Sequence, residues 1–330
     1  MIQNIVAVFF ILLISVACIG SRRRKEQSDR ILISRETSAA LKGLAILLVF
    51  AHHYWQLTSS AYNAHTFIGY VGVTIFLLVA GYVSEVSLRD KGEESLTTWF
   101  FIKKFVRLYV PYICVKLIIG ILQQKSLHNL IAGIVHLEDD WFLCAITVLY
   151  ILFFVTSKIS HGGYNRYMLG GIAVYIIVCA AIGLPSVWYN TSLAFYIGMA
   201  AANHEGLFHR QKASVLVFGS VALLFGVLTA ARLLIPEIIG TIFSASLAIF
   251  LVLILQKFRI QNRILKWIGS ISWEFYLFQS AVLVMLGKCI TSNYVLYFLA
   301  ALLTSIVSGY VVNKIIGILT GKIRQNGTDK

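Results

Sequence analysis

The residues best suited to chemistry in this sequence are a lysine and a histidine that lie eleven positions apart in one apolar segment. Lys42 comes early in the segment, and His53 comes near its end beside His52. Eleven residues are about three helical turns, so Lys42 and His53 share a helix face and lie about 16 Å apart along the axis. A lysine can hold the phosphates of an anionic donor, and an imidazole can deprotonate an acceptor hydroxyl or carry the transferred group. The spacing therefore indicates group transfer in one cavity, with a snorkelling lysine and a hydrogen-bonded core histidine as the structural alternative.

A second basic group stands at the start of a later apolar segment. It consists of Lys103, Lys104 and Arg107. Where these cations meet Lys42 at the same membrane face, they can clamp donor phosphates. Anchoring of helix ends at the cytoplasmic face explains their position equally well.

Further charged residues lie beside or within apolar segments. Asp139 and Asp140 precede Trp141 and can bind a sugar or orient an imidazole, with a solvated loop as the alternative. Lys116 and Glu274 fall inside predicted spans, where a lone charge is costly. These two residues are therefore expected to line a cavity or to pair with each other.

The segments that carry these residues are predicted to be membrane-spanning helices. The chain is 58% hydrophobic and 13% charged with a mean hydropathy of +0.81, more apolar than a water-soluble core of 330 residues requires. Its apolar runs are continuous and about 17 to 25 residues long, which suits helices that cross a bilayer. The predicted fold is an all-α polytopic membrane protein with about eleven crossings. The predicted spans are 2–20, 38–58, 68–88, 104–123, 141–157, 168–184, 188–202, 213–233, 237–256, 271–287 and 293–317.

The distribution of positive charge orients these helices. Nearly all lysines and arginines fall in or beside the loops 21–37, 89–103, 158–167, 203–212 and 257–270 and the C-terminal tail. The exceptions are Lys116 within a span and Lys125, Arg232 and Lys288 on the opposite side of the membrane. Loops rich in lysine and arginine stay in the cytoplasm, so the N-terminus is predicted outside and the C-terminus in the cytoplasm of a bacterial-type plasma membrane.

Charge and cysteine content also limit which partners are expected. The net charge of +14 is explained by contact with anionic membrane lipids, so no nucleic-acid partner is expected. The five cysteines lie in apolar spans without metal-ligand spacing, so no metal is expected. No basic residue precedes the first apolar run, which is therefore expected to remain as an anchor. Nothing in the sequence fixes the oligomeric state.

The segment that contains Lys42 and His53 resembles the first core helix of the acyltransferase-3 family of integral membrane acyltransferases. In that motif an arginine is followed, after ten intervening residues, by a histidine. Four further segments are similar to family landmarks in the same order, and they are 72–82, 101–112, 140–143 and 271–279. The resemblance implies a ten-helix core over 38–320, preceded by an N-terminal helix and basic loop over 1–37 and followed by a tail over 321–330.

The resemblance also implies roles for individual residues. Lys42 takes the family's arginine position, His53 its catalytic histidine, and Lys104 with Arg107 its paired basic positions. Together with Lys103, the basic residues are expected to bind acetyl-CoA or a related acyl-CoA. The expected substrate-binding residues are His52, Lys116, Asp139, Asp140, Trp141, Glu274 and Gln279.

The sequence departs from the family pattern at four positions. Lys42 replaces arginine, which exchanges a planar fork for a point charge. Thr74 stands where an acidic residue is common, Ala80 where serine is usual, and Gln279 where histidine often ends the late motif. These changes bear on substrate choice and on activity.

The expected function is O-acyl transfer, in the simplest case of acetyl, from cytoplasmic acyl-CoA to a hydroxyl of a surface polysaccharide or its lipid-linked precursor. The alternative is a glycan or solute transporter or flippase whose pathway the same polar groups line. A non-catalytic partner in polysaccharide assembly is a third hypothesis, which requires that the four departures abolish activity.

Overall fold

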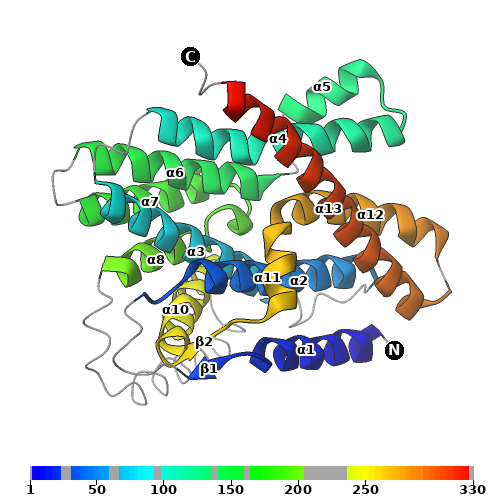
Figure 1. The fold of residues 1–330 in the computed structure, drawn as a ribbon, viewed down its shortest axis with the longest axis horizontal. Coiled ribbons are helices and arrows are strands. Elements are labelled where there is room, and N and C mark those ends of the chain that lie inside the picture. The colour runs from blue at the N-terminus through cyan, green and yellow to red at the C-terminus, as the bar shows by residue number, and fades with distance from the viewer. Residues whose placement is uncertain are drawn as a thin grey trace.

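The computed structural model describes residues 2–23, 31–58, 67–92, 98–135, 140–159, 164–203, 236–290 and 292–326, which form a bundle of α-helices with one small sheet (Figure 1). In chain order the elements are α1 (Ile2–Cys18), β1 (Arg22–Arg23), α2 (Arg35–Thr58), α3 (Phe67–Lys91), α4 (Thr98–Leu122), α5 (Leu127–Val135), α6 (Trp141–Ile159), α7 (Tyr164–Ala181), the 3-10 turn η3 (Ser186–Trp188), α8 (Leu193–Asn203), α10 (Pro236–Lys257), β2 (Phe258–Arg259), α11 (Arg263–Ser270), α12 (Ser272–Cys289) and α13 (Tyr294–Asn326).

Five of the described helices are long and apolar enough to cross a membrane, and α11 with α12 makes a sixth when the bent pair is taken as one span. The five segments are Ile68–Asp90, Lys104–Leu122, Trp141–Ile159, Gly240–Lys257 and Tyr294–Ile318. The predicted all-α membrane fold is thus confirmed, whereas the count of eleven crossings is not. The predicted span 213–233 lies outside the described residues.

The crossing predicted over 188–202 is wrong as a continuous helix. η3 ends at Trp188, and the polar run Asn190, Thr191 and Ser192 separates it from the start of α8 at Leu193. An eleven-residue helix such as α8 rises about 16 Å, roughly half the thickness of the hydrocarbon layer. α8 instead packs within the bundle, where Gly198 lies against the backbone of α3 at Leu78.

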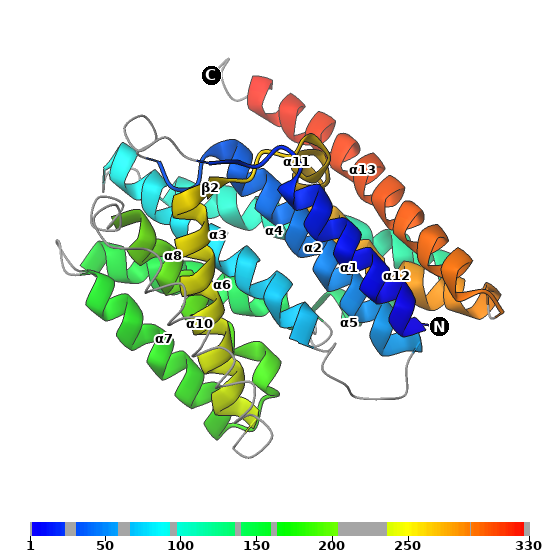
Figure 2. The ribbon, with the colours of Figure 1, turned by 90° about the horizontal axis from the view of Figure 1, so that it is seen from below.

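α2 is the central helix of the bundle. Its residues from Ala45 to Ala51 are all buried, because apolar side chains cover every face of this stretch. Figure 2 shows α1 and α13 on one flank of α2 and α3, with α7 and α10 on the other. The helix predicted to carry the chemistry is therefore surrounded by protein for most of its length.

The predicted loop 257–270 contains a helix, α11, which meets α12 at an angle of 76°. Asn262 starts this helix, because its side chain accepts hydrogen bonds from the backbone N–H groups of Ile264 and Leu265. Lys266 of α11 pairs with Glu36 at the start of α2, with 2.5 Å between Nζ and Oε1. This hydrogen bond and the charge of Lys266 lower the pKa of Glu36. α11 is thereby held across the beginning of α2.

A two-stranded antiparallel sheet fixes the end of α1 to the segment before α11. β1 pairs with β2 so that Arg22 lies opposite Arg259. The Asn262 side chain adds two bonds, donating to the carbonyl oxygens of Val16 at 2.8 Å and Ile19 at 3.0 Å. The contact joins the predicted loops 21–37 and 257–270, which the charge pattern assigns to one side of the membrane.

α5 is a short helix between α4 and α6 that the sequence analysis did not anticipate. Leu130 packs its side chain against Gly120 of α4, and the Tyr112 hydroxyl donates to the carbonyl oxygen of Gly133 at 3.2 Å. Leu127 and Ile131 on the same helix are exposed. An amphipathic helix this short owes its stability to packing on α4.

Candidate functional site

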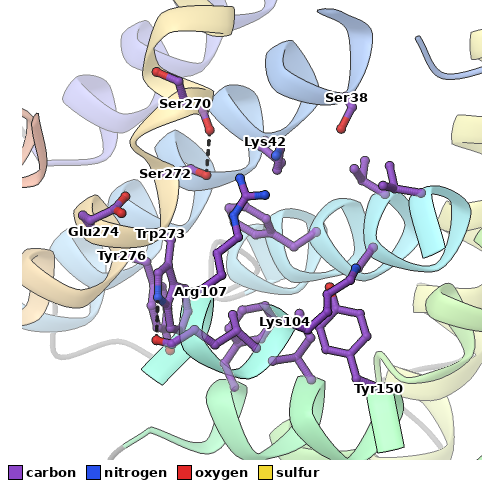
Figure 3. A pocket seen from close by; sticks show the side chains of 18 of the residues that line it. Ser38, Lys42, Lys104, Arg107, Tyr150, Ser270, Ser272, Trp273, Glu274 and Tyr276 are labelled. Carbon is purple, nitrogen blue, oxygen red and sulfur yellow. Dashed lines mark hydrogen bonds between the residues drawn. The ribbon is translucent and has the colours of Figure 1, made fainter. Parts of the chain in front are cut away.

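A cavity of about 240 Å³, here called the cationic cavity, lies between α2, α3, α4, α6 and the junction of α11 with α12 (Figure 3). Its wall includes Lys42 from α2 and Lys104 and Arg107 from α4, the three cations that the sequence analysis grouped together. Glu274 from α12 is the acidic residue of the same wall. The structure therefore brings Lys42 together with Lys104 and Arg107, as predicted.

The three cations differ in how they are held. Lys104 lies 4.4 Å from the ring centroid of Tyr150 and 3.4 Å from the Ser84 hydroxyl, to which it donates. Neither Lys42 nor Arg107 forms an ion pair with any residue that the structure describes. Figure 3 shows the guanidinium of Arg107 directed toward Lys42. The cavity thus has positive charge available for an anionic ligand.

The break between α11 and α12 supplies the polar part of the wall. Ser270 and Ser272 line the cavity on either side of Ile271, and the Ser272 hydroxyl donates to the carbonyl oxygen of Gly269 at 3.0 Å. Trp273 and Glu274, in the first turn of α12, also line it. Because the first N–H groups of a helix have no partner within that helix, this end of α12 favours anions.

Glu274 and Lys116 do not pair, which removes one of the two roles predicted for them. Glu274 accepts a hydrogen bond from Asn313 at 3.0 Å and lines the cationic cavity. Lys116 forms an ion pair with Asp140, with 2.6 Å between Nζ and Oδ2, and its Nζ lies 5.4 Å from the ring centroid of Tyr112. Lys116 and Asp140 neutralise each other at the start of α6 and line neither of the two cavities described here.

A second cavity of about 180 Å³, here called the histidine cavity, holds His52 and His53 of α2. Its wall also includes Gln56, Tyr70, Trp141 and Val187. The His53 Nδ1 lies 3.3 Å from the Gln56 Oε1. Since an amide oxygen only accepts, this bond selects the tautomer with the proton on Nδ1 and leaves Nε2 as a base.

His52 is fixed by close packing. Its ring lies against Gly69 of α3, where an added Cβ would come within 2.7 Å of the imidazole. The ring centroids of His52 and His53 are 5.3 Å apart, and the Nδ1 of His52 is buried without a hydrogen-bond partner. His52 therefore offers an unused polar atom at the histidine cavity.

Lys42 and His53 line separate cavities, so the prediction of one shared cavity is wrong. Tyr276 belongs to the wall of both cavities, and its ring contacts Phe142 and Trp273 in the wall of the cationic cavity. The rings of Trp273 and Tyr276 are stacked with centroids 5.5 Å apart. Helix spacing carries no information about side chains of other helices, such as Tyr276, that contribute to the walls of both cavities.

The other predicted site residues take different positions. Gln279 is fully buried in α12 and lines neither cavity, and neither polar atom of its amide has a hydrogen-bond partner among the described residues. Trp141 lines the histidine cavity. Lys103 belongs to α4, but its side chain is not among the described parts of the structure. Asp139 lies outside the described residues altogether.

The structure also shows the surroundings of two residues that depart from the family pattern. Ala80 lines the cationic cavity, so a serine at this position would place a hydroxyl at the cavity wall. Thr74 forms a buried hydrogen bond with Ser244 of α10 at 2.9 Å and lines neither cavity. The change at Thr74 thus affects packing between α3 and α10.

Several wall residues were missed because they have no distinctive residue type. They are Tyr150, Ser270, Ser272, Trp273, Tyr276 and Asn313. Trp273 and Tyr276 lie three positions apart in the family-like segment 271–279, and this spacing on one helix face was the available signal. Among the described residues, no group of three or more histidine, cysteine or acidic side chains is arranged to hold a metal ion.

Comparison with known proteins supports the chemistry that the cavities suggest. Searches among curated proteins and among solved structures find no match. A family model described as an acyltransferase domain matches residues 39–314, which include both cavities and nearly the whole helical bundle. Because this match covers most of the 330 residues, the chain belongs to the acyltransferase-3 family of membrane acyltransferases.

Proposed function

We propose that the protein transfers an acyl group, in the simplest case acetyl, from acyl-CoA to a hydroxyl of a cell-surface polysaccharide or its lipid-linked precursor. The observation that carries this proposal is the arrangement of two cavities, one lined by cations and one by histidines, that share Tyr276. Such an arrangement suits a reaction in which a large anionic donor and a neutral acceptor approach from different sides.

The cationic cavity suits the donor. Coenzyme A carries several phosphate charges, and Lys42, Lys104 and Arg107 together with the first turn of α12 provide attractive groups for them. These residues belong to regions that the charge pattern assigns to the cytoplasmic side, where acyl-CoA is found. The donor would place its thioester toward the aromatic group at Tyr276.

The histidine cavity suits the acceptor. Tyr70 and Trp141 offer aromatic surfaces to a sugar, and the Nε2 of His53 is the available base. His53 takes the proton of the acceptor hydroxyl while the hydroxyl oxygen attacks the thioester carbonyl carbon. The new C–O bond forms, the C–S bond breaks, and the leaving thiolate of coenzyme A takes up a proton from the His53 imidazolium. Atoms and charges balance without a metal.

The experiment combines donor binding with acyl transfer in cells. The purified protein is expected to bind acetyl-CoA, and cells that carry a folded His53→Ala variant are expected to lose glycan acetylation by at least about 100-fold. His128→Ala is the matched control, because His128 lies exposed on α5 away from both cavities. Undiminished acetylation with His53→Ala removes His53 from the mechanism. A wild-type protein that neither binds acetyl-CoA nor transfers its acetyl group refutes the proposed donor.

A further inference from the structure

Tyr276 occupies the position where the two cavities meet. It lies in the second turn of α12 and forms part of the wall of the cationic cavity and of the histidine cavity. A group held between the donor side and the acceptor side would therefore lie beside this side chain. In the proposed reaction that group is the acyl thioester.

The Tyr276 ring is held in a fixed orientation. Trp273 stacks on it at an interplanar angle of 11°, and Phe142 packs against it with ring centroids 5.5 Å apart. Trp273 is fixed in turn, because its Nε1 donates to the carbonyl oxygen of Leu108 at 3.0 Å. Figure 3 shows Trp273 and Tyr276 side by side next to Arg107. The phenol is thus oriented before any ligand binds.

The half-buried Tyr276 makes no side-chain hydrogen bond to any residue that the structure describes. Other buried tyrosines of this bundle do have partners: Tyr54 donates to Tyr294, Tyr112 to Gly133 and Tyr297 to Leu283, each at a backbone carbonyl oxygen. The Tyr276 hydroxyl lacks such a bond and belongs to a residue at a cavity wall, so it is suited to donate to a ligand.

Resting on the acyl transfer proposed above, we propose that Tyr276 binds the thioester at the junction of the cavities and donates a hydrogen bond to its carbonyl oxygen. This oxygen gains negative charge when the acceptor hydroxyl attacks. A hydrogen-bond donor that is oriented in advance therefore stabilises the transition state more strongly than it stabilises the bound substrate. Tyr276 keeps its proton throughout, while the acceptor proton passes to His53. Tyr276 is thereby a catalytic residue that the spacing of Lys42 and His53 did not reveal.

Tyr276→Phe tests the hydroxyl and retains the ring. Full-length protein in inside-out membrane vesicles is supplied with acetyl-CoA labelled in its acetyl group, and label in the glycan fraction is measured. The maximal rate is expected to fall about 100-fold, while the KM for acetyl-CoA rises by no more than about fivefold. Tyr297→Phe is the matched control, because it also removes a buried hydroxyl from the bundle, but one that binds Leu283. The control is expected to lower the thermal stability and leave the maximal rate unchanged.

A binding measurement makes the test independent of turnover. S-ethyl coenzyme A lacks the carbonyl oxygen of acetyl-CoA, so the wild-type protein is expected to bind acetyl-CoA about fivefold more tightly than this thioether. Tyr276→Phe is expected to remove that difference, whereas Tyr297→Phe is expected to keep it. A structural role for the Tyr276 hydroxyl would weaken the binding of both ligands equally and would overturn the proposal.

The outcomes separate this inference from the proposed function. If the wild-type protein transfers label from acetyl-CoA and Tyr276→Phe does so at the same maximal rate, the role of Tyr276 is refuted and acyl transfer stands. If the wild-type protein transfers no label and binds neither coenzyme, the proposed function fails and the inference fails with it.

Discussion

Gly43 of α2 and Gly269 of α11 lie against each other's backbone. A Cβ added to Gly43 would overlap the carbonyl oxygen of Leu265, and one added to Gly269 would overlap that of Ala39. The two helices therefore cross at a distance that only glycine permits. Because Lys42 precedes Gly43 and Ser270 follows Gly269, this crossing also fixes two parts of the cationic cavity.

Substitution at the helix crossing is expected to separate α2 from α11. Gly269→Ala should lower the free energy of unfolding by about 1–3 kcal/mol, because the added methyl group has no space and the backbone must move. Thermal unfolding in detergent measures the effect, and acetyl-CoA binding should weaken with it. Gly170→Ala is the control, since nothing lies within 4 Å of a Cβ there and alanine favours the helix. Equal stability of the two variants would contradict the crossing.

Removal of a cation from the cationic cavity is expected to weaken donor binding. Lys42→Met or Arg107→Met should raise the Kd for acetyl-CoA by about 10- to 100-fold, as expected for the loss of one charge-assisted contact with phosphate. The increase in Kd caused by each substitution should be smaller for the acetyl thioester of dephospho-coenzyme A, which carries less negative charge. Lys314→Met is the control, because Lys314 lies over Tyr310 on α13 and lines neither cavity. An unchanged Kd in both cavity variants would show that phosphate binds elsewhere.

Gln56 is expected to act by holding the His53 ring. Gln56→Ala removes the acceptor of the Nδ1 proton, so the wrong tautomer becomes accessible and the maximal rate of transfer should fall about tenfold. The KM for acetyl-CoA should not change, since Gln56 does not line the cationic cavity. Steady-state kinetics of labelled acetyl transfer distinguish the two parameters. Leu57→Ala, at the exposed neighbouring position, should leave both unchanged. A Gln56→Ala enzyme with the wild-type rate would show that the bond does not orient His53.

The ion pair between Lys116 and Asp140 is expected to contribute to stability. Lys116→Met alone leaves a poorly solvated carboxylate, and Asp140→Leu alone leaves an unpaired ammonium group, so each should cost about 3 kcal/mol. The double variant Lys116→Met with Asp140→Leu should lose much less than the sum, because neither charge then remains. Unfolding of the four proteins in a double-mutant cycle measures the coupling. Additive losses would mean that the pair contributes no interaction of its own.

The ion pair between Glu36 and Lys266 predicts a specific dependence on pH. Its hydrogen bond holds the pKa of Glu36 below the usual value of about 4.3, so the stabilisation is complete above that value and disappears as the pH falls through the lowered pKa. The melting temperature of Glu36→Gln should lie slightly below that of the wild type at pH 6 and equal it in strong acid. The difference is expected to be small, because both side chains are exposed and water screens them. A difference that grows toward acid pH would contradict the assignment.

Much of the architecture follows from the sequence because bilayer solvation leaves few choices. Long apolar runs such as those of α3, α6 and α13 must be helices, since a helix satisfies its own backbone hydrogen bonds in hydrocarbon. Charge position grouped Lys42 with Lys104 and Arg107, and the cavity wall confirms that grouping. The motif around His53 is equally a property of the local sequence, and the family it resembles is the one whose model matches residues 39–314.

Only the tertiary structure decided how these pieces divide the site. The crossing of Gly43 with Gly269 and the place of Tyr276 in the walls of both cavities join residues of α2 with residues more than 200 positions later in the chain. Helical periodicity states which residues of one helix share a face, but it does not state which side chain of another helix lies against that face. The grouping of the positive charges was therefore readable from the sequence, whereas the division of the site into two cavities that share Tyr276 was not.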